Sequence, residues 1–133
     1  MDRNLQLLGI ARKAGLVAIG GDAVSSAALT GRAKLVISAV DSSEGSIRRA
    51  RINAKENSII YITVPYTKFE LGNITGRGSP GTVAILDAGL AAGFLKGLAE
   101  KDPDKYGGAA EQLADETENL AKRRKHTSRR AAK

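Results

Sequence analysis

The chain has 133 residues, no cysteine, and 21 lysines and arginines against 14 aspartates and glutamates, for a formal net charge of +7 at pH 7. The lack of cysteine excludes disulfides, thiolate metal sites and thiol nucleophiles, and no apolar run approaches the roughly 20 residues that cross a bilayer. The N-terminus lacks the form of a secretory signal, so we expect a cytoplasmic protein of one domain with an appendage.

The charges are distributed unevenly along the chain. Residues 1–97 carry 12 basic and 7 acidic side chains, residues 98–121 carry 2 and 7, and residues 122–133 carry 7 and none. A mildly basic body, an acidic connector and a strongly basic end are typical of a protein with an anionic partner. Nucleic acid is the commonest such partner, and a membrane surface is the alternative.

Residues 2–14 have the apolar spacing of a helix that ends at Gly15. The predicted inner face is a stripe formed by Leu7, Leu8, Ile10, Ala11 and Ala14. Arg12 and Lys13 fall in the last turn, where the helix dipole favours cations. Arg12 and Lys13 could therefore either stabilise the end of this helix or contact RNA, and the sequence leaves both alternatives open.

A glycine pair separates a short apolar strand, predicted over residues 16–19, from a second helix predicted over residues 22–30. Gly20 and Gly21 permit a sharp turn and the close approach of another molecule. Asp22 is the expected N-cap, because its carboxylate can accept a free N–H of the first turn. A helix start after a strand can hold polar ligands, and RNA is the ligand we expect, with an ordinary strand-to-helix turn as the alternative.

Strands and helices alternate along the rest of the body. Strands are predicted over residues 35–40, 59–63 and 82–86, and helices over residues 44–56, 67–72 and 87–98. This alternation predicts an α/β domain over residues 1–98, with a sheet between two helical layers. Arg48, Arg51 and Lys55 form a basic stripe on the third helix, for which a solvated face is the simplest explanation.

The remaining residues, 99–133, are expected to be an acidic linker and helix followed by a basic tail. The Pro and Gly pattern of residues 102–108 indicates the linker. Residues 109–125 have only a thin apolar stripe, so we expect a loosely docked or independent helix. Residues 122–133 have no apolar side chain larger than alanine and are expected to be disordered when unbound. Their cations suit phosphates, and a solubility role is the alternative.

Four motifs occur in order along the body: Leu-Leu-Gly-Ile-Ala-Arg-Lys-Ala-Gly at 7–15, Gly20, Gly-Arg-Ala-Lys-Leu-Val-Ile at 31–37 and Val-Pro-Tyr-Thr-Lys-Phe-Glu-Leu-Gly at 64–72. Together they resemble the ribosomal protein family of the L-seven-Ae and L-thirty-e type, in particular its small bacterial YlxQ-like branch. The resemblance covers about residues 3–98. It implies a three-layer α/β/α sandwich around a mixed four-stranded sheet, and binding of kink-turn RNA without catalysis.

The resemblance also implies where RNA binds. In the kink-turn binders the loop after the first strand reads Gly-Thr-Asn-Glu, with a lysine three residues beyond the glutamate. Gly20 keeps the glycine, whereas Gly21, Asp22, Ala23 and Ser26 stand at the positions of the Thr, Asn, Glu and Lys. The glycine turn is thus kept, but the side chains that contact RNA bases in the family are changed. Each lost base contact reduces the binding free energy by about 1–3 kcal/mol. We therefore expect weakened kink-turn binding.

A second RNA surface of the family follows its Leu-Gly motif, which here is Leu71-Gly72. The loop beyond it offers Arg77 among glycines in place of an apolar wedge. Such a side chain suits contact with the phosphate backbone, and a solvated loop residue is the alternative.

These features predict a non-catalytic, ribosome-associated monomer that binds structured RNA, with ribosomal RNA as the expected target and no cofactor or metal. The alternative is a protein-interaction module on the same fold. Catalysis is disfavoured because the single histidine, His126, lies in the tail and no nucleophile–base pair is visible. The predicted RNA contacts are Arg12, Lys13, Gly20, Gly21, Asp22, Ser26, Arg77, Lys122, Arg123, Arg124 and Lys125.

Overall fold

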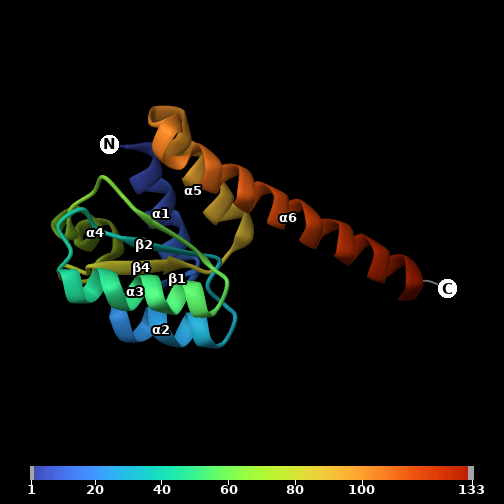
Figure 1. The fold of residues 1–133 in the computed structure, drawn as a ribbon, viewed down its shortest axis with the longest axis horizontal. Coiled ribbons are helices and arrows are strands. Elements are labelled where there is room, and N and C mark those ends of the chain that lie inside the picture. The colour runs from blue at the N-terminus through green and yellow to red at the C-terminus, as the bar shows by residue number, and fades with distance from the viewer. Residues whose placement is uncertain (1, 132–133) are drawn as a thin grey trace.

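Four short strands form the central layer of the computed structural model, and helices cover both faces of the sheet (Figure 1). The strands are β1 (Val17–Ile19), β2 (Leu35–Ser38), β3 (Ile60–Thr63) and β4 (Thr82–Ile85). The helices are α1 (Arg3–Lys13), α2 (Gly21–Leu29), α3 (Glu44–Glu56), α4 (Lys68–Thr75), α5 (Ala88–Lys101) and α6 (Pro103–Ala131). The structure describes the backbone of residues 2–131 and the side chains of residues 2–118.

The sheet is mixed and open, with the strand order β1-β4-β2-β3. β1 and β2 each pair antiparallel with β4, whereas β2 and β3 pair in parallel. Helix α3 makes the crossover that parallel strands require. Every residue of the two central strands, β2 and β4, is buried, as their continuous apolar sequences predict. The three-layer α/β/α fold expected from the sequence is confirmed, and β1 and β3 are its two edge strands.

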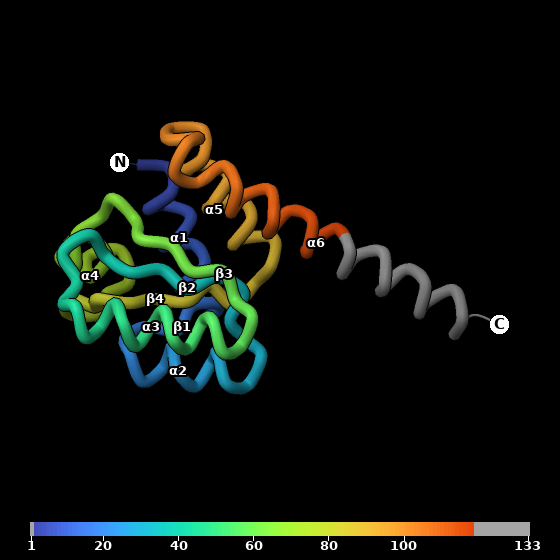
Figure 2. Tube along the Cα trace, in the orientation of Figure 1, coloured from blue at the N-terminus to red at the C-terminus, as the bar shows by residue number. Residues whose placement is uncertain are grey.

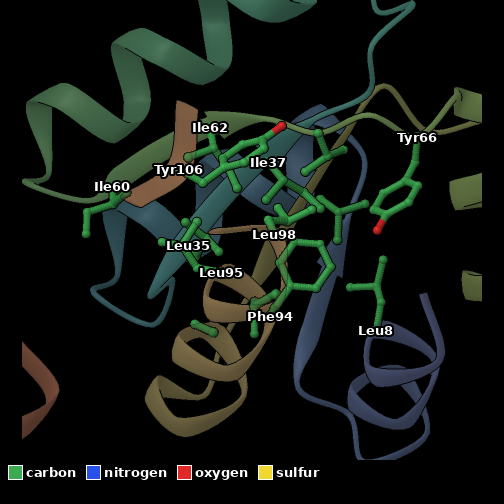
Figure 3. Packing of buried hydrophobic residues seen from close by; sticks show 14 of the residues in the cluster. Leu8, Leu35, Ile37, Ile60, Ile62, Tyr66, Phe94, Leu95, Leu98 and Tyr106 are labelled. Carbon is green, nitrogen blue, oxygen red and sulfur yellow. The ribbon is translucent and has the colours of Figure 1, made fainter. Parts of the chain in front are cut away.

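Alternation along the strands divides the interior into two cores. On one face, Leu35 and Ile37 of β2 pack with α1, α4, α5 and α6, around the fully buried ring of Phe94 (Figure 3). On the other face, Val36 of β2 packs with small residues of α2 and α3, such as Ala27 and Ala50. Helices α2 and α3 therefore pack on this face of the sheet mainly through small side chains.

Side chains cap the starts of α4 and α5. Thr67 and Glu70 form the capping box of α4, and Asp87 accepts the N–H of Leu90 at the start of α5. α4 continues past Leu71-Gly72 to Thr75 and ends at Gly76 in the left-handed region. The expected end of α4 at Gly72 was therefore wrong, because Gly72 remains helical and is needed for a close packing contact described below.

The predicted inner face of α1 was displaced. The buried residues of this helix are Asn4, Leu5, Leu8 and Ala11, whereas Leu7 is only partly buried and Ile10 is 59% exposed. Asn4 faces inward because Gly97 of α5 leaves room for its amide, and a Cβ at Gly97 would overlap the Asn4 side chain. The buried face of α1 therefore includes this polar residue and differs from the stripe that apolar spacing alone predicts.

Asp2 ties the N-terminus to two other elements. Its Oδ1 accepts the N–H of Asn4 at 2.7 Å and the hydroxyl of Tyr66 at 2.9 Å, and its Oδ2 lies 2.6 Å from Nζ of Lys101. Burial acts to raise the pKa of Asp2, but these hydrogen bonds outweigh it and the pKa is lowered. Burial and the bond to Asp2 raise the pKa of the Tyr66 hydroxyl.

The C-terminal segment departs from its prediction. Only Asp102 separates α5 from α6, and the chain reverses there so that α6 runs back along α5 (Figure 2). Of the expected linker at residues 102–108, only Asp102 lies outside a helix, and residues 103–108 are the first turns of α6. The helix is also docked, because Tyr106 and Leu113 are each 3% exposed and the Tyr106 hydroxyl donates to the carbonyl of Thr63 at 2.7 Å. The apolar stripe considered in the sequence had omitted Tyr106.

Candidate nucleic-acid interface

The turn between β1 and α2 is formed by a glycine in a conformation that side chains rarely adopt. Gly20 has φ 91° and ψ 160°, and its N–H donates to the carbonyl of Thr82 at 2.9 Å. Gly20 is the N-cap of α2, and no side chain caps this helix. The first N–H groups of α2 are therefore available to an anionic or carbonyl-bearing ligand, and the partial positive charge of the helix start favours an anion.

Asp22 has a different role from the one predicted. The helix begins at Gly21, so Asp22 lies in the first turn and does not cap it. Its carboxylate accepts from Nη2 of Arg49 in α3 at 2.8 Å, while its own side chain is 97% exposed. The Arg49 guanidinium extends across Gly21, where a Cβ would lie 2.9 Å from Nη1. A side chain at Gly21 would therefore displace the tip of the Arg49 side chain, which is 51% exposed, from its present position beside Asp22.

A groove with a volume of about 370 Å³ runs along the open edge of β1. Its lining includes Ala23 and Ser26 of α2 and Arg77 from the loop between α4 and β4. The structure therefore brings together Ser26 and Arg77, which lie 51 positions apart in the sequence. Arg32 also lines the groove. We had not selected Arg32 from the sequence, although the basic turn Gly31-Arg32-Ala33-Lys34 after the second helix was a usable signal.

The loop that carries Arg77 is held against α4 through Gly72. The N–H groups of Gly76 and Arg77 both donate to the carbonyl of Gly72, at 2.8 and 3.2 Å. A Cβ at Gly72 would lie 2.8 Å from the carbonyl carbon of Gly78 and would overlap its oxygen. Gly72 is therefore the position at which the loop folds back on its own helix, and this contact places Arg77 at the edge of β1.

Arg12 approaches the same loop from the end of α1. A Cβ at Gly76 would lie 3.1 Å from Nη2 of Arg12, so the guanidinium packs over this glycine. Lys13 is the next residue and is exposed. Arg12 thus packs against the loop that carries Arg77, with Lys13 next to it in the chain. Gly20, Gly21 and Asp22 do not line the groove at β1, and Gly21 lines a separate pocket with Arg49 of α3.

The cations of this interface are not neutralised by the protein. The ion pairs among the described side chains, residues 2–118, are Arg49–Asp22 and Lys101–Asp2. Arg12, Lys13 and Arg77 pair with no carboxylate of this region, and the side chain of Arg32 donates from Nε to the hydroxyl of Thr30, at 3.2 Å. Four positive side chains around an edge strand and an uncapped helix start make a surface suited to phosphate groups.

Other kinds of site are not visible in the described part of the chain. Residues 2–118 hold no group of three or more histidine or carboxylate side chains placed to bind a metal ion. Within the described residues, no helix has both the length and the apolar character needed to span a bilayer. The predicted contacts at Lys122, Arg123, Arg124 and Lys125, and the expected disorder of residues 122–133, fall on residues whose side chains lie outside the described part.

A comparison with protein families matches residues 2–92 to the ribosomal protein L7Ae/L30e/S12e/Gadd45 family. The chain belongs to this family. The matched region begins in front of α1 and ends within α5, so it includes the whole sheet and the residues of the candidate interface between Arg12 and Arg77. The family is one of ribosomal, RNA-binding proteins and is generally non-enzymatic.

Among solved structures, the protein is similar to one described as a protein of unknown function from Bacillus halodurans. The two have 23% sequence identity and superpose with a TM-score of 0.67, over 73% of this chain and 97% of the other. At this identity the similarity shows the fold alone. The finer placement in a YlxQ-like branch, and a domain boundary at residue 98, remain predictions.

Proposed function

We propose that the protein binds structured RNA, with ribosomal RNA as the target, across the turn between β1 and α2 and along the open edge of β1. Family membership supports an RNA partner. The observation that carries the specific site is the groove at β1, which Arg32 and Arg77 line together with exposed Ser26, with no carboxylate of the described residues paired to either arginine. Association with the ribosome, a monomeric state and a cytoplasmic location belong to the same proposal.

Each part of the surface has a distinct task in this proposal. Arg77, Arg32 and Arg12 bind phosphates, which supply most of the affinity without reading sequence. The backbone N–H groups after Gly20 bind an oxygen at the helix start. Because the groove carries no side chain that reads a guanine edge at Ala23 or Ser26, the protein recognises the shape of folded RNA more than its bases.

The basic end of the chain adds electrostatic affinity to this site. Residues 122–133 contribute seven positive charges. In a plot of the logarithm of the binding constant against the logarithm of the salt concentration, each phosphate that a cation neutralises makes the slope more negative by about 0.7–0.9. Replacing Lys122, Arg123, Arg124 and Lys125 by glutamine in the full chain should therefore lower the affinity and reduce the salt slope by about 3.

The test is fluorescence anisotropy with ribosomal RNA fragments and a kink-turn RNA at several salt concentrations. Arg77→Gln should weaken binding about three- to tenfold and lower the salt slope by about one. Lys96→Gln removes an exposed charge on α5, away from the groove, and is the matched control. Absence of binding to every folded RNA at low salt, or equal effects of the two substitutions, contradicts the proposed site.

A gain-of-function experiment tests the turn itself. Ala23 and Ser26 are both exposed on α2 and line the groove. Restoring the polar set that the resemblance implies, by Ala23→Glu together with Ser26→Lys, should raise the affinity for kink-turn RNA by at least about tenfold, because each good base contact contributes about 1–3 kcal/mol. An unchanged affinity would mean that this surface does not receive that RNA.

A further inference from the structure

A second and larger groove lies at the opposite edge of the sheet from β1. It has a volume of about 780 Å³ and runs between helix α3 and the edge strand β3. Two central strands, β4 and β2, separate it from the proposed RNA site. An occupant of this groove would therefore not share contacts with RNA bound at β1.

The rim of this groove is positively charged. Arg48, Arg51 and Lys55 are exposed side chains of α3 that line it, and no carboxylate of residues 2–118 lies within ion-pair distance of them. Glu44, at the start of α3, is the one acidic side chain of the lining. Three cations against one carboxylate give the groove a net charge of +2, which favours a negatively charged occupant.

The floor of the groove is apolar and mainly aliphatic. Ile52 is 47% exposed, and Ile59 and Tyr61 are partly buried beside it. The Tyr61 hydroxyl is buried without a hydrogen-bond partner. Single-stranded RNA binds through flat aromatic faces on which bases stack, and this floor offers branched aliphatic side chains with a single ring. Leucine-like side chains of a protein partner fit such a floor better than nucleobases.

We propose that the groove between α3 and β3 binds an acidic, amphipathic helix of a partner protein. The occupant's apolar side chains cover Ile52 and Ile59, and its carboxylates pair with Arg51 and Lys55 at the rim. From Glu44 to Lys55 the groove extends over about 18 Å of helix, at about 1.5 Å per residue, which matches about three turns of an incoming helix. The protein thus presents RNA-binding and protein-binding surfaces on separate edges of one sheet.

The experiment is a titration of the full-length, 15N-labelled protein followed by amide NMR spectra. The probe is a designed peptide of about 15 residues, roughly four helical turns, with leucines along one face and glutamates along the other. The amide signals of Ile52, Ile59 and Tyr61 should shift on addition of this peptide, while those of Gly20 and Arg77 remain in place. A peptide with lysine at each glutamate position should shift none of them.

Matched variants connect binding to the named side chains. Arg51→Gln together with Lys55→Gln should weaken peptide affinity about tenfold or more, whereas Arg3→Gln with Lys96→Gln, which removes the same charge elsewhere, should leave it unchanged. Ile52→Ser should also weaken peptide binding. All three variants should bind RNA with the affinity of the parent protein. A result that refutes peptide binding in the groove is therefore distinguishable from one that refutes RNA binding at β1.

Two results would overturn this inference. One is the absence of shifts in the groove at millimolar acidic peptide. The other is a single-stranded RNA oligonucleotide that shifts the signals of Ile52 and Tyr61 more strongly than the acidic peptide does, which would assign the groove to nucleic acid.

Discussion

Replacement of Gly72 by alanine tests how the loop carrying Arg77 is held. The added Cβ would lie 2.8 Å from the carbonyl carbon of Gly78 and 3.2 Å from the carbonyl oxygen of Arg77. These are backbone atoms, so the clash is relieved only if the loop moves away from α4. The movement also breaks the 3.2 Å hydrogen bond from the N–H of Arg77 to the carbonyl of Gly72.

The expected loss of stability follows from three contributions. Overpacking costs about 1–3 kcal/mol, and the lost hydrogen bond costs about 1 kcal/mol. Alanine is favoured over glycine inside a helix by about 1 kcal/mol, which offsets part of the loss. The free energy of unfolding should therefore fall by about 1–3 kcal/mol, measured by guanidinium denaturation. Affinity for RNA should fall as well, because Arg77 leaves the groove.

Gly93→Ala is the matched control for this substitution. Gly93 is exposed in the interior of α5, and a Cβ there would make only an ordinary contact, 3.7 Å from Cδ2 of Leu7. This variant should gain about 0.5–1 kcal/mol from helix propensity. If Gly72→Ala proved as stable as the parent or stabilised the protein to the extent that Gly93→Ala does, the described packing of the loop would be refuted.

Two further predictions concern the anchoring of the termini. Tyr106→Ala should destabilise the fold by about 3–5 kcal/mol and Tyr106→Phe by about 1 kcal/mol, as measured by urea denaturation; values near zero for both would mean that α6 is not docked. The pKa of Asp2 is lowered from 3.8, so its stabilising effect is present above that pH and is lost as the pH falls through the lower folded-state pKa. Asp2→Asn should accordingly reduce stability at pH 7 and converge with the parent in strong acid, and a difference that stays constant with pH would contradict this.

The layered fold was predictable because most of its signals are local. The continuous apolar sequence of β2 indicated a central strand, and the capping box at Thr67 marked the start of α4. The face of α1 was not predictable from apolar spacing, since a buried asparagine, Asn4, occupies it. The docking of α6 depends on Tyr106 reaching Thr63, a contact across 43 residues that no local pattern records.

The candidate interface was partly predictable for the same reason. Gly20 was recognised because a glycine between a strand and a helix is a local signal. The ion pair of Asp22 with Arg49 joins two helices, and Arg32 reaches the groove only because β1 lies at the edge of the sheet. Such placements arise from tertiary packing, so the sequence identified the turn, Arg12, Lys13 and Arg77, but not Arg32 or the partner of Asp22.

The hydrogen bond from Tyr106 to Thr63 has a consequence for self-association. β3 is an edge strand, and the unpaired carbonyls of such strands are templates on which other chains can polymerise. Because the Tyr106 hydroxyl already occupies the carbonyl of Thr63, α6 blocks the addition of a further strand at this point. Helix α6 therefore covers part of the open edge of β3 as well as completing the core.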